Sequence, residues 1–304
     1  MAEAKTTTVQ MDDGAKLHVK LLGDDPSSTK PLCIGLHGAP GLCSHADAEA
    51  YCSHLSSLFR VLVFDGRGSG VSDLTGPYTH ERWMKDIENL RIWAGAEKFV
   101  LCGHSYGGFL ALDYAVNYID RLQGLILIDT WTVGTLGAMT ALANILQSDR
   151  VKPDKDRQVR IWSGNLLSDQ DYQDGITEIL PFYAPPGDLT KETTANAGHQ
   201  STKSGELFGP GRRFHIHSKT QNWAFGHNMP RFDVRQRLKD ITVPTLVTVG
   251  RHDYVTPLSF AEEIATGVPD ARLELFEDSG HAPHSDEPEK FNRILLDFLK
   301  TRIL

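Results

Sequence analysis

The strongest constraint on the fold is an alternation of short apolar runs with longer amphipathic segments. Apolar runs typical of buried strands occupy residues 17–22, 32–36, 61–64, 99–102, 122–128, 245–249 and 273–276. Segments with helical periodicity separate most of them, at residues 46–59, 81–94, 108–118, 260–265 and 288–300. Strands that alternate with helices form a mainly parallel sheet covered on both faces. We therefore predict an α/β fold with a doubly wound sheet.

The alternation stops between residues 131 and 235. This stretch has helical pieces interrupted by prolines and by a glycine-rich "FGPGRR". A structureless loop of such length is uncommon inside a compact domain. We therefore predict a core domain made of residues 1–130 and 236–304, with residues 131–235 inserted into it as a helical cap.

Charge and composition exclude several classes of partner. The chain has 31 basic and 39 acidic residues, a formal net charge of −8, and so carries no basic field for nucleic acid or an anionic membrane. No apolar run approaches the roughly 20 residues needed to span a bilayer, and the first residues lack the apolar core of a signal peptide. The four cysteines have no metal-type spacing. We expect a cytoplasmic protein and leave its oligomeric state open.

A serine lies between the apolar run at 99–102 and the helical segment that follows. The motif is Gly103-His104-Ser105-Tyr106-Gly107, a match to G-x-S-x-G. In a sharp turn from strand to helix, small residues two positions before and after the serine let the two elements approach, and the serine projects into solvent. Ser105 is therefore the candidate nucleophile; the alternative is a serine that only caps a helix.

A serine nucleophile needs a base, and the base needs a carboxylate that orients it. Asp253 in "VTVGRHDYVTP" follows one predicted strand, and His281 in "FEDSGHAPHSDEP" follows the last one. The order serine, acid, histidine is the order of hydrolases with this serine turn. We predict a triad of Ser105, Asp253 and His281, although Asp253 alone could cap a helix and His281 alone could be a loop histidine.

The oxyanion of an acyl-transfer intermediate needs hydrogen-bond donors. The stretch His37-Gly38-Ala39-Pro40-Gly41 follows the run at 32–36, and the backbone N–H of Ala39 is placed to act with that of Tyr106. Gly38 lets the backbone approach a substrate closely. The alternative is an ordinary turn rich in glycine and proline.

Neither a metal nor an organic cofactor is expected. The "GRGSG" stretch has the wrong spacing for a dinucleotide loop, and we expect Asp65 and Arg67 to pair there within a tight turn. The cap histidines lack any accompanying metal motif. Among the cap aromatics, Trp223 and Phe225 are candidates for an apolar substrate pocket; the alternative is packing inside the cap.

Several of these motifs together resemble one known family. "HGAPG", "DGRGSGVS", "GHSYGG", "GRHDYVTP" and "SGHAPHSDEPEKF" are similar to α/β-hydrolases of the proline iminopeptidase group, as is "NWAFGHNMPRFDVRQRLKDITVPTL" in the cap. The resemblance covers residues 17–304. It implies a serine hydrolase of aminopeptidase or amidase type that acts on a small molecule or short peptide with a free N-terminal residue, often proline. On that pattern Ser105, Asp253 and His281 are the triad.

The sequence departs from that group in two places. The group usually has two glycines where this chain has Gly38-Ala39, which preserves the backbone N–H. The cap also has no close match to the glutamate motif with which those peptidases hold a substrate's ammonium group. Cap acids are nevertheless plentiful, namely Asp169, Asp171, Asp174, Glu178, Asp188, Glu192 and Glu206. Two alternatives therefore stay open: an esterase or lactonase acting on a small metabolite, and a non-catalytic ligand receptor on a hydrolase fold.

Overall fold

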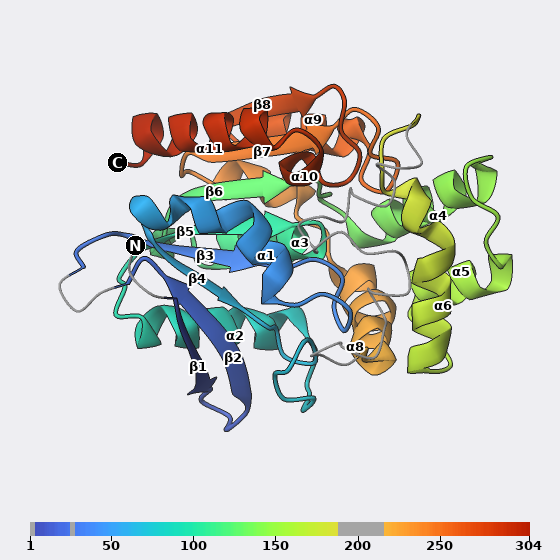
Figure 1. The fold of residues 1–304 in the computed structure, drawn as a ribbon, viewed down its shortest axis with the longest axis horizontal. Coiled ribbons are helices and arrows are strands. Elements are labelled where there is room, and N and C mark those ends of the chain that lie inside the picture. Colours follow the sequence, from blue (N-terminus) through green and yellow to red (C-terminus); the bar gives the residue numbers. More distant parts are fainter. Residues whose placement is uncertain (1–3, 25–27, 188–215) are drawn as a thin grey trace.

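The computed structural model describes residues 4–24, 28–187 and 216–304, and it has an eight-stranded sheet at its centre (Figure 1). The strand order is β1-β2-β4-β3-β5-β6-β7-β8. The pairs β1–β2 and β2–β4 are antiparallel, whereas every pair from β4 to β8 is parallel. The predicted α/β class with a mainly parallel sheet is confirmed.

The strands are short and mostly match the apolar runs of the sequence. They are β1 (Lys5–Gln10), β2 (Lys16–Leu22), β3 (Leu32–Leu36), β4 (Arg60–Phe64), β5 (Phe99–His104), β6 (Leu122–Ile128), β7 (Thr245–Gly250) and β8 (Ala271–Phe276). The helices of the sheet region are α1 (His45–Cys52), α2 (His80–Trp93), α3 (Tyr106–Asn117), α9 (Leu258–Gly267), α10 (Pro283–Asp286) and α11 (Pro288–Arg302).

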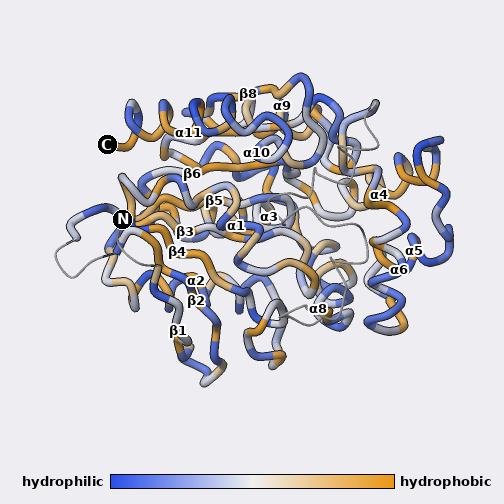
Figure 2. The backbone as a smooth tube through the Cα atoms, viewed as in Figure 1, coloured by the Kyte–Doolittle hydropathy of each residue, from blue (hydrophilic) through white to orange (hydrophobic). Residues whose placement is uncertain are grey.

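Alternate residues of the central strands enter two separate hydrophobic cores, one on each face of the sheet. In β3, Cys33 belongs to the core that contains residues of α1 and α11, whereas Ile34 belongs to the core with residues of α2, α3 and α9. Because side chains on a strand alternate between its faces, strands buried on both sides are apolar along their length. Figure 2 shows this as orange tube along the middle strands.

The chain between β6 and β7 has only helical elements among its described residues. They are α4 (Gly134–Gln147), α5 (Lys155–Ser163), α6 (Asp169–Ile179), α8 (Ser218–Trp223) and several short turns of 3₁₀ or π helix. The two ends of this segment meet at an antiparallel bridge between Val133 and Asp233. This bridge supports the proposed division into a core and a cap of residues 131–235. Within the described ranges, no helix is long and apolar enough to cross a membrane.

Two local expectations need correction. The helix expected at 46–59 is interrupted: α1 ends at Cys52 and a 3₁₀ turn follows at Ser53–Ser57. Its serines compete for backbone hydrogen bonds and so disfavour a continued α-helix. Strand β1 was not expected because its side chains are mostly exposed and form no apolar run; it is held by its ladder to β2.

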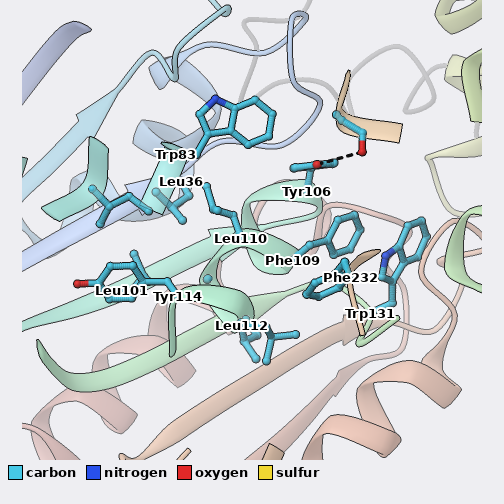
Figure 3. Close-up of a cluster of buried hydrophobic side chains, with 14 of the residues drawn as sticks. Leu36, Trp83, Leu101, Tyr106, Phe109, Leu110, Leu112, Tyr114, Trp131 and Phe232 are labelled. Atoms are coloured by element: carbon cyan, nitrogen blue, oxygen red, sulfur yellow. Dashed lines mark hydrogen bonds between the residues drawn. The ribbon is translucent and has the colours of Figure 1, made fainter. Parts of the chain in front are cut away.

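The aromatic rings at the start of the cap pack directly on the helix that follows Ser105. Phe109 of α3 stacks on Trp131 with ring centroids 4.4 Å apart and planes at 9°, and both side chains are buried (Figure 3). Phe232, near the other end of the cap, lies 6.0 Å from Phe109 between ring centroids. This cluster therefore joins both ends of the cap to the sheet domain.

We expect Phe109→Ala to lower the free energy of unfolding by about 3–5 kcal/mol, because it leaves a cavity in this cluster. Urea denaturation followed by fluorescence would measure the change. Ile92→Ala is the matched control, since Ile92 is 64% exposed on a helix of the same face and should change stability by no more than about 0.5 kcal/mol. Equal effects of the two substitutions would contradict this account of the junction.

Candidate active site

Ser105 is held in a strained conformation at the turn between β5 and α3. Its backbone has φ 53° and ψ −118°, a combination that residues with a side chain rarely adopt. Its N–H donates to the carbonyl oxygen of Ile128 at 2.9 Å, which ties the turn to the neighbouring strand β6. The residue is half-buried, so its side chain keeps access to solvent.

The two glycines of the serine motif allow this turn to form. A Cβ atom on Gly103 would lie 2.3 Å from the carbonyl oxygen of Gly107, and one on Gly107 would lie 2.3 Å from that of Leu36. Contacts this short do not occur between real atoms, so a side chain at either position would force strand and helix apart. Both glycines are needed for packing, as the motif predicts.

Asp253 and His281 lie beside each other, each just beyond the end of a strand. His281 Nδ1 donates to Asp253 Oδ2 at 2.7 Å, and both side chains are buried. The other oxygen of Asp253 accepts the N–H groups of Val255 and Thr256 at 2.8 and 2.9 Å, and the Thr256 hydroxyl donates to Oδ2. The carboxylate is thereby fixed by its own loop while it orients the imidazole.

The charge state of Asp253 follows from these contacts. Burial opposes its ionisation, but the charge of His281 and the hydrogen bonds from His281 and Thr256 outweigh burial and lower the pKa of Asp253 to about 2. His281 Nε2 is buried and has no hydrogen-bond partner among the described residues, Ser105 included. With Nδ1 donating to Asp253, Nε2 is the nitrogen left to accept a proton.

The predicted oxyanion donors lie on two loops next to Ser105. Tyr106 is the first residue of α3 and so carries an N–H that the helix leaves without an internal partner. Ala39 N–H makes no hydrogen bond within the described part of the chain, and Ala39 itself is partly exposed. A Cβ atom on Gly38 would lie 3.3 Å from Ser105 Cβ, so the loop passes close to the serine.

Asp47 and His104 form a buried pair behind these loops that the sequence analysis did not identify. Asp47 Oδ2 accepts the N–H of Gly38 at 2.7 Å and lies 3.3 Å from His104 Nδ1. His104 Nε2 donates to the carbonyl oxygen of His281 at 2.8 Å. One carboxylate and one imidazole thus connect the oxyanion loop, the serine turn and the base. The only sequence signal was the position of His104 next to Ser105.

His104 donates from both ring nitrogens and is therefore placed to be an imidazolium. Burial alone would lower its pKa, but the charge and hydrogen bond of Asp47 and the hydrogen bond to the His281 carbonyl raise the pKa of His104 above its usual value. When protonated, His104 donates to the Asp47 carboxylate and to the His281 carbonyl at the same time.

A second buried acid lies next to the triad residues and was also missed. Asp129 directly follows β6, is fully buried and has a positive φ of 46°. Its Oδ1 accepts the N–H of Gly250 at 3.0 Å. The sequence offers a similar signal for Asp129 and Asp253, since Asp129 directly follows β6 and Asp253 lies in the loop just after β7.

The two cap aromatics lie in different surroundings. Phe225 is buried, and its ring centroid is 5.8 Å from that of Tyr106, next to the candidate nucleophile. Trp223 is 37% exposed and its ring lies against His227. Phe225 is therefore the better placed of the two for an apolar pocket, and the role of both stays a prediction. The cap also reaches His281, whose N–H donates to the carbonyl of Tyr183 at 2.8 Å.

Four of the cap acids named from the sequence lie within the described residues and make polar contacts within the cap. They are Asp169, Asp171, Asp174 and Glu178. Arg157 forms ion pairs with the last three, and Asp169 accepts hydrogen bonds from the N–H and hydroxyl of Ser218. The other acids named from the sequence, Asp188, Glu192 and Glu206, lie outside the described residues.

Three clusters within the described ranges have the donor types of a metal site. They are Cys33 with Cys52 and Cys102, His18 with His45 and Asp65, and Asp129 with Asp253 and His281. The three thiols are buried among apolar side chains of one core. Asp65 accepts N–H groups of His45 and Val71, which orders the turn. The expected pairing of Asp65 with Arg67 is wrong. Arg67 forms ion pairs with Asp86 and Asp13 instead, because the folded chain brings these two carboxylates within reach of its guanidinium.

The comparisons with known proteins bear on the family and the fold. Residues 34–294 match the Alpha/beta hydrolase family. The proline iminopeptidase PfmaB of Pestalotiopsis fici is 31% identical over 90% of this chain and 92% of its own length. A proline iminopeptidase of Saccharolobus solfataricus is 30% identical, over 88% and 84%. The structure of the enol-lactonase from Burkholderia xenovorans LB400 is similar in fold, with a TM-score of 0.71 at 22% identity over 97% of this chain and 100% of that one.

We expect His104 to make stability depend on pH. Because the folded-state pKa of His104 is raised, its stabilising contribution is complete below its unfolded pKa of about 6.5 and is lost as pH rises through the folded value. The difference in free energy of unfolding between the wild type and His104→Gln should therefore be larger at pH 5.5 than at pH 8. Urea denaturation at both pH values would measure it.

His54→Gln is the matched control for this measurement. Burial lowers the pKa of His54, so its protonation destabilises the fold as pH falls. The stability difference between wild type and this variant should shift in the opposite direction. A shift of the same sign for both variants would contradict the proposed charge of His104.

Proposed function

The chain belongs to the Alpha/beta hydrolase family, and we propose that it is a serine hydrolase whose triad is Ser105, His281 and Asp253. The observation that carries this proposal is the buried 2.7 Å hydrogen bond from His281 Nδ1 to Asp253. A bond of this kind fixes the tautomer in which the other ring nitrogen accepts a proton. The carbonyl of His281 accepts from His104, the residue that precedes Ser105 on its strained turn.

The reaction follows from these positions. His281 Nε2 takes the hydroxyl proton of Ser105 as Ser105 Oγ attacks the substrate carbonyl carbon. The N–H groups of Ala39 and Tyr106 donate to the oxyanion, while Asp253 stabilises the imidazolium. His281 then protonates the leaving group, an acyl-enzyme remains on Ser105, and a water activated by His281 releases the acid.

For the substrate, we infer an amide or peptide bond next to a free N-terminal residue, with proline as the first candidate. The support is the similarity over most of the chain to two proline iminopeptidases. Phe225 beside Tyr106 suits a compact apolar ring near the nucleophile. A small molecule or short peptide is the expected substrate, and no metal or organic cofactor takes part in these steps.

An esterase or lactonase acting on a small metabolite is the second candidate. The observation that favours it is the engagement of Asp169, Asp171, Asp174 and Glu178 by side chains of the cap itself. A substrate amine needs a carboxylate partner in a buried site, whereas a neutral ester or lactone does not. The two candidates therefore differ in their response to the substrate's charge.

Ser105→Ala and His281→Ala should each lower kcat at least about 10³-fold, because the triad acts as a unit. Turnover of proline p-nitroanilide and p-nitrophenyl acetate would measure this, with thermal melting to check the fold. Ser259→Ala and His252→Ala are the controls, since the hydrogen bonds of the Asp253 and His281 side chains in the described structure involve neither of these two side chains. Turnover by Ser105→Ala above a tenth of the wild-type value would exclude the mechanism. A wild-type protein that is folded but shows no turnover would favour the alternative of a non-catalytic ligand receptor.

Masking the substrate amine should distinguish the two substrate classes. We expect kcat/KM for N-acetyl-proline p-nitroanilide to be at least about tenfold below that for proline p-nitroanilide, because a charged hydrogen bond contributes roughly 1.5–3 kcal/mol. The two compounds share their leaving group, so the comparison isolates the amine. Faster turnover of the acetylated amide or of simple esters would support the esterase or lactonase.

A further inference from the structure

Asp129 occupies a position beside the triad that matches that of Asp253. Strands β6 and β7 are neighbours in the sheet, with Ile128 opposite Thr248, and each is followed by a buried aspartate. Asp129 N–H donates to Thr248 O at 3.0 Å, and Gly250 N–H donates to Asp129 Oδ1 at 3.0 Å. Hydrogen bonds of its backbone N–H and of its side chain thus hold Asp129 in its strained backbone conformation.

The second oxygen of Asp129 is the unusual feature. Oδ2 is buried and accepts no hydrogen bond from an N–H or O–H donor of the described residues. Ligand atoms of Asp129, Asp253 and His281 all lie within 4.8 Å of one another. A buried polar atom without a partner is costly, and structures rarely retain one.

A proton on Asp129 resolves this arrangement. Two ionised carboxylates so close together in a buried site would repel each other, and the site has one imidazole to serve both. Burial and the charge of Asp253 raise the pKa of Asp129 well above its usual range. Asp253, which His281 and Thr256 hold as an anion, is then the acceptor that a neutral Asp129 would have beside it.

We propose that Asp129 is a positioning residue and reserve acid of the site, which holds Asp253 by a carboxyl–carboxylate hydrogen bond and orients His281 when the Asp253 carboxylate is absent. This role rests on the proposed triad. With Asp253 removed, no anion disfavours ionisation of Asp129. One of its carboxylate oxygens already lies within 4.8 Å of a ring nitrogen of His281. With Asp253 removed, it offers the Nδ1 proton a charged acceptor, which is stronger than the neutral hydroxyl oxygen of Thr256 at 3.4 Å.

The test compares Asp253→Ala, Asp129→Asn and the double variant. The readout is the rate at which a fluorophosphonate probe labels Ser105, which needs no knowledge of the substrate. Asp129→Asn alone should label within about threefold of wild type, because asparagine still accepts from Gly250 N–H and donates to Asp253. Asp253→Ala should label about 10²-fold slower, and the double variant about 10⁴-fold slower, the loss typical when a triad acid is removed.

The effect of Asp129→Asn should depend on whether Asp253 is present, and a residue with a merely structural role would not show this dependence. Asp129→Asn should be nearly silent when Asp253 is present and cost at least about tenfold when it is absent. The control double variant Asp253→Ala with Asp278→Asn removes an exposed acid of the His281 loop and should label like Asp253→Ala. Equal labelling of Asp253→Ala and Asp253→Ala with Asp129→Asn would overturn the proposal.

A second measurement covers a double variant that does not fold. In Asp253→Ala, the Nδ1 proton of His281 should still give a low-field ¹H resonance, because Asp129 accepts this proton in a hydrogen bond. The resonance is assigned by its absence from the double variant Asp253→Ala with His281→Ala. Absence of that resonance from folded Asp253→Ala would also overturn the proposal. If Ser105→Ala were labelled at the wild-type rate, the proposed triad itself would fail, and the role of Asp129 with it.

Discussion

The site depends on how closely β5 and α3 approach each other. Backbone atoms of Gly103, Gly107 and Leu36 lie where side chains would collide, so strand, helix and the neighbouring strand β3 meet almost without intervening atoms. This contact forces the strained turn at Ser105 and leaves the first N–H of α3 beside it. The loop that carries Gly38 and Ala39 follows β3, so the same contact brings the candidate oxyanion donors to the serine. The sheet itself supplies the stability that sustains the strain.

The sequence predicted the structure best at positions where the fold accepts only one type of residue. Buried parallel strands need apolar residues on both faces, so the six parallel strands β3 to β8 could be predicted from their runs. The antiparallel strand β2 could be predicted from the apolar residues of its one buried face. Ser105, Asp253 and His281 could be selected because each follows such a run. Strand β1 could not be predicted, because its side chains are mostly exposed and only Val9 is buried. Asp47 and His104 could not be selected, because their role arises from contacts between α1, β5 and the loop of His281, which are remote in sequence. Asp129 had a readable position, but only the fold shows that it lies beside Asp253.

The proposed base, His281, is held by groups from both parts of the chain. His281 donates its side-chain proton to Asp253 of the sheet domain and its backbone N–H to Tyr183 of the cap, while its carbonyl accepts from His104. Burial of all these groups makes each hydrogen bond directional and expensive to lose. Docking of the cap therefore contributes to the orientation of the imidazole as well as to the shape of any pocket above it. Substitutions in the cap would then alter catalysis without touching a substrate.

The bridge between Val133 and Asp233 has a consequence for how this fold diversifies. Because the inserted segment leaves and re-enters the sheet domain at adjacent points, its length and sequence are free to change while the ladder β6–β7 keeps its register. The entropic cost of such a loop grows only slowly with its length. Insertions of different length and sequence are thus able to occupy the same place in this fold, provided that each still supplies the contact that Tyr183 makes with His281.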